Sequence, residues 1–202
     1  MVKRKVCSGC NRPAKVCLCP WLTTVENQQE LIVLRHKSET KHALNSVKIL
    51  EECLTNITVY DGECFDENLD FVSQLKGKKE VFMLYPSDDA KYVEELDMSP
   101  DALIIVLDGT WPKTRLIRYE TKILESVQCI TFRALPKSNY RIRKGPESGT
   151  STLEAVTLLL EKVEQEKGKY QPLLSAFEKM IDFQIECMGE ETYNKNYPGG
   201  SK

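Results

Sequence analysis

Short apolar runs alternate with helical patterns along the chain from residue 30 onward. Five runs have the length and the β-branched and aromatic content of strands, and they span residues 30–36, 56–60, 80–86, 101–109 and 128–134. Amphipathic helical patterns cover residues 42–54, 112–127, 150–166 and 172–188. Strands that are apolar on both faces and separated by helices are typical of a parallel sheet that is covered on both sides. The pattern therefore predicts an α/β fold: a mostly parallel sheet with helices on both faces.

Ligands of such sheets bind in the crevice at the carboxyl ends of the strands. That rule gives three candidate site loops, residues 84–90, 107–113 and 133–155. The sequence contains neither a G-x-G-x-x-G motif nor the lysine motif of a P-loop. Ordinary dinucleotide and nucleoside triphosphate sites therefore lose their main support.

Length and composition favour one main domain. The chain has 202 residues, of which 41% are hydrophobic, and this is enough to form a proper core. No run approaches the roughly 18 to 20 consecutive apolar residues of a membrane-spanning helix, and the charged N-terminus lacks the apolar region of a signal peptide. We therefore expect a cytoplasmic protein with no membrane partner, whose cysteines are reduced rather than paired in disulfides.

Charge is unevenly distributed although the formal net charge is only -2. Residues 1–25 include five basic residues and no acidic one, and residues 111–145 include nine basic and two acidic residues. Residues 26–110 include eight basic and eighteen acidic residues. Two basic segments on an acidic body are typical of a protein that meets a phosphate backbone on one face. Solvated surface charge that happens to cluster is the alternative.

Four cysteines form a C-x2-C-x6-C-x-C pattern near the N-terminus: Cys7, Cys10, Cys17 and Cys19. Two close pairs joined by a turn supply the four soft ligands that tetrahedral zinc prefers, and Gly9 permits a tight backbone in the first pair. A site with four cysteine ligands has no open position, so the pattern predicts structural rather than catalytic zinc. Four ordinary thiols are the alternative. The other cysteines are scattered, and each is expected to be a small core residue.

A second metal site is a weaker hypothesis. His36, Glu39 and His42 are ligand types spaced three apart. On a helix, however, His36 and His42 lie about 600° apart and so share no face. A structural role or a substrate contact at a junction between strand and helix is favoured instead.

Four segments resemble the DTW-domain family, and they occur in the family's order. They are "VLRHKSETKHALNSVKIL" (33–50), "MLYPSDDA" (83–90), "LDGTWPKT" (107–114) and "YRIRKGPESGTSTLEAV" (140–156). With the cysteine cluster, the resemblance covers nearly the whole chain. The departures are small: Gly149 and Thr150 precede Ser151 where leucine is common, and Arg35 precedes His36 where glutamine is frequent. The resemblance divides the chain into a zinc-binding motif (1–25), a DTW catalytic domain (26–190) and a flexible tail (191–202).

The resemblance implies a tRNA-uridine aminocarboxypropyltransferase. Such an enzyme moves the 3-amino-3-carboxypropyl group of S-adenosylmethionine to N3 of a uridine in tRNA. The family's fold is related to the SPOUT class, with a donor pocket formed by a knotted C-terminal half. Two alternatives remain: a SPOUT-like methyltransferase that uses the same donor to modify RNA, and a zinc-ribbon module that binds RNA without catalysis.

Asp108 is the expected catalytic residue, because it ends a strand at the crevice. Its carboxylate would accept the proton of uridine N3 or orient the base, and an N-cap or a structural acid is the alternative. Gly109 permits a close backbone approach, and Thr110 is a candidate N-cap of a helix that starts near Pro112. Trp111 would stack on the target base or on adenine, or else pack in the core.

The remaining expected contacts fall into two groups. The residues expected to bind the donor are Leu84, Tyr85, Pro86, Ser87, Asp108, Gly109, Thr110, Trp111, Ser151, Thr152 and Glu154. Within this group, the free N–H groups at a helix start would suit the donor's carboxylate, although a plain capping box also explains the serine and glutamate. The residues expected to bind RNA are Lys113, Arg115, Arg118, Arg141 and Arg143. As parts of an extended segment, the last two would point to one side, toward phosphate or toward the donor's carboxylate.

Overall fold

A six-stranded parallel sheet forms the centre of the protein. The computed structural model describes residues 5–10, 12–42, 44–142 and 149–197. The strands are β1 (Glu30–His36), β2 (Ile57–Gly62), β3 (Val81–Leu84), β4 (Lys91–Tyr92), β5 (Leu103–Asp108) and β6 (Gln128–Thr131). Their order across the sheet is β2-β1-β5-β3-β6-β4, and every neighbouring pair is parallel. The predicted α/β class and the parallel sheet are therefore confirmed.

The central strand β5 is buried along its whole length, because β1 pairs with one of its edges and β3 with the other. The pairing sets Asp108 opposite Arg35 on β1 and places both near the carboxyl ends of their strands. Alternation along the strand sends Ile104 and Val106 into one apolar layer and Leu103, Ile105 and Leu107 into the other. Strand β5 thereby joins the two halves of the core.

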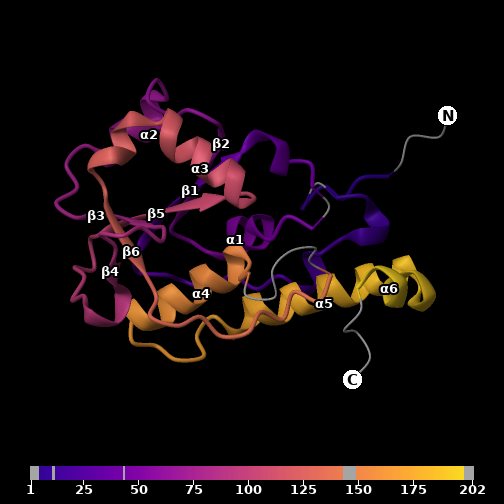
Figure 1. Cartoon of the computed structure of the whole chain (residues 1–202). Helices are drawn as coiled ribbons and strands as arrows, with labels where there is room; N and C mark the ends of the chain where they lie inside the picture. Colours follow the sequence, from indigo (N-terminus) through magenta and orange to yellow (C-terminus); the bar gives the residue numbers. More distant parts are fainter. Residues whose placement is uncertain (1–4, 11, 43, 143–148, 198–202) are drawn as a thin grey trace.

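Helices cover both faces of the sheet, as predicted. One face is packed by α1 (Val47–Cys53), α4 (Thr152–Val163) and α5 (Gln171–Met188). The other is packed by α2 (Leu69–Leu75) and α3 (Trp111–Glu120). Figure 1 shows α2 and α3 above the sheet and α4 and α5 below it. The knot expected in the C-terminal half stays a prediction.

Two helices are shorter than their sequence patterns predict. The pattern over 42–54 becomes α1, which begins only at Val47, because the Asn45 side chain binds Glu39 O and Lys48 N and holds a loop before the helix. The pattern over 112–127 ends as an α-helix at Glu120. There the Asp66 carboxylate accepts from the N–H groups of Lys122 and Ile123, which would otherwise continue the helix.

Short 3-10 helices occupy several connections. They are η1 (Ala14–Val16), η2 (Cys19–Trp21), η3 (Lys37–Glu39), η4 (Val93–Glu95) and η5 (Lys122–Ser126). The second of these packs on α5, where Trp21 and Phe183 lie 6.3 Å apart between ring centroids. Arg12 reaches the same helix through Met180, with 3.5 Å between Nη1 and Sδ. The described part of the N-terminal segment thus packs against α5.

The expected flexible tail, residues 191–202, is partly helical. Residues 191–196 belong to α6 (Glu190–Asn196), which follows α5 after Gly189 at a φ of 81°, and Tyr197 is its C-cap residue. Tyr193 is buried against the core and stacks on Tyr197 at 5.7 Å between ring centroids. One buried tyrosine thus anchors this helix, while the flexibility of the tail stays a prediction and residues 198–202 lie outside the described residues.

None of the described helices is long and apolar enough to cross a membrane.

The Glu164 carboxylate ties the C-terminal end of α4 to the start of β1. It accepts hydrogen bonds from the N–H groups of Gln28 and Gln29, from Lys169 Nζ at 2.7 Å and from the Tyr170 hydroxyl at 2.6 Å. The side chain has no exposed surface. Burial opposes ionisation, but these four donors outweigh it and lower the pKa of Glu164 below its ordinary value.

Replacing Glu164 with glutamine should lower the free energy of unfolding by about 2 kcal/mol, because hydrogen bonds to a charged group are worth about 1.5 to 3 kcal/mol. A carboxylate whose folded-state pKa is depressed stabilises above its unfolded pKa, near 4.3, and loses that contribution as pH falls through the folded value. Urea unfolding should therefore show a large Glu164→Gln effect at pH 7 that shrinks below about pH 4. Glu166→Gln is the control, since Glu166 pairs with the same lysine at the surface. Equal effects of the two substitutions would contradict the buried role.

Candidate functional site

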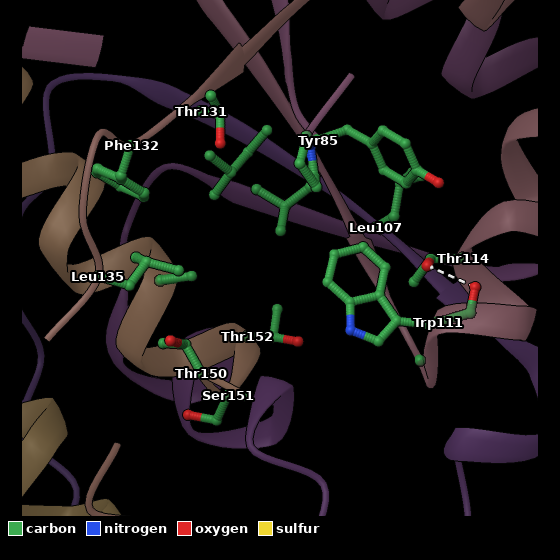
Figure 2. A pocket seen from close by; sticks show the side chains of 16 residues that line it. Tyr85, Leu107, Trp111, Thr114, Thr131, Phe132, Leu135, Thr150, Ser151 and Thr152 are labelled. Atoms are coloured by element: carbon green, nitrogen blue, oxygen red, sulfur yellow. Dashed lines mark hydrogen bonds between the residues drawn. The ribbon is translucent and has the colours of Figure 1, made fainter. Parts of the chain in front are cut away.

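A cavity of about 260 Å³ lies at the carboxyl ends of β3, β5 and β6. The N-terminal ends of α3 and α4 close it, and Figure 2 shows their side chains turned toward the same space. Its lining residues are Leu84, Tyr85, Pro86, Val106, Leu107, Gly109, Trp111, Thr114, Thr131, Phe132, Leu135, Gly149, Thr150, Ser151, Thr152 and Ala155. This is the edge of the sheet where the sequence places the ligand site, and all three candidate loops contribute to it.

Trp111 stands at the mouth of the cavity. Its side chain is 51% exposed, and it meets Tyr85 edge-on at 6.2 Å between ring centroids. The Arg118 guanidinium lies 4.8 Å above the same tyrosine ring. Core packing of the tryptophan, one of the two interpretations of the sequence, is excluded by this exposure. A flat aromatic face is therefore presented to any ring that enters the cavity.

Gly109 allows the backbone to turn sharply from β5 into α3. Its φ is 154°, and a Cβ at this position would lie 3.0 Å from Lys113 Cβ and 3.5 Å from His36 Cβ. Thr110 is the N-cap residue of α3, as predicted, although its side chain makes no capping hydrogen bond. Proline follows at Pro112 within the first turn, where a missing N–H costs nothing. This local geometry brings Trp111 over the end of the strand.

Asp108 lies behind the wall of the cavity and does not line it. Its residue is 6% exposed. Oδ1 accepts from the Thr152 hydroxyl at 2.6 Å, and Oδ2 accepts from Asn45 Nδ2 at 3.2 Å. Burial raises the pKa of Asp108 above its ordinary value, while these two hydrogen bonds act in the opposite direction. The geometry therefore connects this carboxylate to the cavity through Thr152.

Side-chain pairs occupy the residues at the end of β1 and in η3. Lys113 Nζ lies 2.6 Å from a Glu39 carboxylate oxygen, and His36 Nε2 lies 2.8 Å from Glu63. The other ring nitrogen of His36 lies 2.9 Å from the Ser38 hydroxyl. His36, Glu39 and His42 do not form a metal-ligand cluster among the described residues. His36 and Glu39 have partners at this junction between strand and helix, and the choice between a structural role and a substrate contact stays a prediction.

The start of α4 is a complete capping box. Ser151 Oγ accepts from Glu154 N, and the Glu154 carboxylate accepts from Ser151 N. The same carboxylate also accepts from the Ser138 hydroxyl at 2.7 Å and from Asn139 N at 2.8 Å. Because Glu154 already places a negative charge at this helix end, the site does not favour a second anion there.

The structure brings together seven of the residues expected to bind the donor. The cavity is lined by Leu84, Tyr85, Pro86, Gly109, Trp111, Ser151 and Thr152, but not by Ser87, Asp108, Thr110 or Glu154. Ser87 instead binds Asp89 at 2.7 Å. The cavity is also lined by four residues that the sequence patterns do not mark: Thr114, Thr131, Phe132 and Leu135. One signal was present, because Thr114 follows Trp111 by three residues and so lies on the same side of α3.

The residues expected to bind RNA differ in their exposure to solvent and in the partners that they already have. Arg115 is exposed on α3, Arg118 covers Tyr85, and Lys113 is engaged by Glu39. Arg141 lies in a turn rather than an extended segment and pairs with Asp182 on α5. Arg143 lies outside the described residues, so the expected pairing of the two arginines on one side stays a prediction.

The four N-terminal cysteines gather as the spacing predicts. Their sulfur atoms all lie within 4.8 Å of one another, and three pairs are 3.4, 3.6 and 3.8 Å apart. Four thiolates at about 2.3 Å from one zinc ion would be separated by about 3.8 Å. A Cβ on Gly9 would lie 2.8 Å from Cys19 Sγ, so only glycine leaves room for this sulfur. The cluster therefore fits a zinc ion in donor type and spacing.

Comparisons with known proteins agree with this geometry. The DTW domain family matches residues 4–185. The tRNA-uridine aminocarboxypropyltransferase 2 of Macaca fascicularis is 31% identical over 91% of this chain and 65% of its own length. Its Mus musculus counterpart is 29% identical over 96% of this chain and 68% of its own length. The Drosophila melanogaster counterpart is 28% identical over 96% and 81%, respectively. The chain thus spans about two thirds of its mammalian relatives.

Among solved structures, the A. aeolicus TrmH/SpoU tRNA modifying enzyme is 11% identical and covers 83% of this chain and 94% of its own, at a TM-score of 0.37. This similarity is weak, and the assignment of the fold is based on the six-stranded sheet of this chain. The family match extends from the cysteine cluster through the cavity to α5 and includes every element that forms the site. The chain is a member of the DTW domain family.

Proposed function

We propose that this protein transfers the 3-amino-3-carboxypropyl group of S-adenosylmethionine to N3 of a uridine in tRNA. Its DTW family membership and relatives named tRNA-uridine aminocarboxypropyltransferase support the proposal. One observation carries it: the segment Asp108–Trp111 sets a half-exposed indole at the mouth of an apolar cavity, where the central strands end. A nucleobase and an adenosine both present flat rings to such a surface.

The proposed transfer exchanges one bond for another. Uridine N3 attacks the γ-carbon beside the sulfonium, an N–C bond forms, and the C–S bond breaks to leave neutral 5′-methylthioadenosine. The N3 proton leaves to solvent, because the described residues that line the cavity include no acid, histidine or lysine. The protein contributes mainly by holding the two reactants in line, which is worth several kcal/mol when the geometry is tight.

The cavity walls fit the donor in chemical character. Leu84, Val106, Leu107 and Phe132 offer an apolar surface for adenine. Gly109 keeps the backbone clear of a side chain at the junction with α3. Since Asp108 is buried, we propose that it orients groups in the cavity through Thr152 and does not touch the uridine.

Nucleoside analysis tests the function directly. The purified protein is incubated with unmodified tRNA and S-adenosylmethionine, the tRNA is digested, and the nucleosides are identified by mass spectrometry. A uridine that has gained the aminocarboxypropyl group supports the proposal. A methylated uridine would instead identify a methyltransferase, and unchanged nucleosides with retained tRNA binding would favour a non-catalytic RNA-binding module.

Trp111→Ala should weaken binding of the stacked partner by about 5-fold to 150-fold, since base stacking on an aromatic side chain is worth about 1 to 3 kcal/mol. Trp111→Phe should retain most of the affinity, because it keeps a flat ring. Separate titrations with tRNA and with S-adenosylmethionine identify which ring is stacked. Unchanged affinity for both ligands in the alanine variant would rule out stacking by Trp111.

The exposed face of α3 is the proposed tRNA surface. Arg115 is exposed, Tyr119 is 70% exposed, and Lys122 lies 4.7 Å from the ring centroid of this tyrosine. Cations interleaved with an aromatic ring suit both the phosphates and the bases of RNA. The face begins at Trp111, so RNA bound along it would reach the cavity mouth.

Arg115→Ala should reduce tRNA affinity and lower the slope of log affinity against log salt by about 0.7 to 0.9 for each phosphate that the variant no longer neutralises. Lys195→Ala is a matched control, because it removes an exposed cation from α6, which lies apart from α3 (Figure 1). Filter binding at several salt concentrations measures both variants. Equal slopes for Arg115→Ala and the parent protein would remove α3 from the RNA interface.

Zinc is the proposed metal of the cysteine cluster, and its role is structural because four sulfur ligands leave no open position. Metal analysis of protein purified without chelators should find about one zinc ion per chain. Cys17→Ser should lose the metal and loosen the N-terminal motif, while Cys187→Ser, which changes an exposed cysteine outside the cluster, should retain it. Full zinc content in the Cys17→Ser protein would contradict the site.

A further inference from the structure

The hydroxyl oxygen of Thr152 faces the cavity, and its single proton is already donated in a hydrogen bond. Thr152 is the first residue of α4, it lines the cavity, and its hydroxyl donates to Asp108 Oδ1 at 2.6 Å. A hydroxyl has one proton and two lone pairs. On the cavity side, Thr152 is therefore a hydrogen-bond acceptor.

Asn45 lies on the other side of the Asp108 carboxylate and fixes which groups donate and which accept hydrogen bonds. Its Nδ2 donates to Asp108 Oδ2 at 3.2 Å and to Glu39 O at 3.2 Å, while its Oδ1 accepts from Lys48 N at 3.3 Å. These three partners define which amide atom is nitrogen. Both Asp108 oxygens thus act as acceptors, Oδ2 from Asn45 and Oδ1 from Thr152.

A second hydroxyl of the cavity has the same polarity. Thr114 Oγ1 donates to Trp111 O at 3.2 Å, as Figure 2 shows, and so its lone pairs remain for the cavity. The described lining residues include no Asp or Glu. Two hydroxyls among these residues are hydrogen-bonded to a carboxylate. Ser151 Oγ donates to Glu154 at 2.7 Å, but that carboxylate also accepts from the Ser138 hydroxyl and from the N–H groups of Asn139 and Ser151. Thr152 donates to Asp108, which is only 6% exposed and accepts one further hydrogen bond, from Asn45.

We propose that Thr152, backed by Asp108, binds the α-ammonium group of the donor. An ammonium has three hydrogen-bond donors and no acceptor, which complements an acceptor that lies next to a buried negative charge. The donor's carboxylate would be repelled from the same place by Asp108, and the start of α4 already carries the Glu154 carboxylate. This inference rests on the proposed function, in which S-adenosylmethionine is the donor. It adds how the transferred group is oriented, with its ammonium toward Thr152.

Three probes separate the ammonium from the rest of the donor. S-adenosylmethionine has the ammonium and the carboxylate, its decarboxylated form has only the ammonium, and 5′-methylthioadenosine has neither. Hydrogen bonds to charged groups are worth about 1.5 to 3 kcal/mol, so Thr152→Val should weaken both ammonium-bearing probes roughly 10-fold to 100-fold in calorimetric titrations. Binding of 5′-methylthioadenosine should stay within about twofold, and Thr152→Ser should restore the parent affinities.

Asp108→Asn tests the direction of the hydrogen bond between Thr152 and residue 108, because asparagine has nearly the same shape as aspartate. Asn45 Nδ2 remains a donor and selects the new amide oxygen, so the new amide nitrogen faces Thr152 and turns its hydroxyl proton toward the cavity. The same selective loss as in Thr152→Val is expected. Thr157→Val is the control, since it removes a buried threonine hydroxyl one and a half turns along α4, outside the cavity. Thermal melting of each variant verifies that it is folded.

The outcomes are distinct. If the parent protein binds none of the three probes, the donor assignment fails and this inference fails with it. If the parent binds them and Thr152→Val binds all three equally well, only the ammonium site is wrong. If Thr152→Val weakens S-adenosylmethionine but spares its decarboxylated form, Thr152 serves the carboxylate and the proposal is overturned.

Discussion

The buried carboxylate of Asp108 is the interaction on which the site depends. It joins three segments that are far apart in the sequence: the loop before α1 through Asn45, the end of β5, and the start of α4 through Thr152. A buried charge is costly unless hydrogen bonds satisfy it, so the three segments are held in one arrangement. The cavity is the space that this arrangement leaves in front of the carboxylate.

The same constraint explains the sharp change in direction after β5. A strand that ends in Asp108 keeps the carboxylate on a rigid element, and Gly109 then releases the chain at a φ that few other residues adopt. Helix α3 can therefore begin at once, with Trp111 at its first position. The aromatic face at the mouth and the charge behind the wall are thus two consequences of one short turn.

Sequence patterns predict the sheet well because burial on both faces requires continuous apolar runs, as in β1 and β5. They predict the helix ends less well, because long-range side chains decide them: Asp66 takes the N–H groups that would have extended α3. The site shows the same division. Asp108 and Trp111 are conspicuous in the sequence, but whether each faces the cavity depends on partners such as Asn45, which lies 63 positions earlier in the chain.

Charge distribution and fold together explain how an acidic protein can receive a polyanion. The acidic middle of the sequence supplies Glu39 and Glu63, which pair with Lys113 and His36 beneath the site. These pairs occupy the acidic side chains, whereas Arg115 on α3 remains exposed. The described part of the N-terminal motif lies on the side toward which the strands point, and α3 lies beside the same edge of the sheet (Figure 1). A phosphate backbone drawn to that edge would meet the mouth rather than the acidic remainder of the surface.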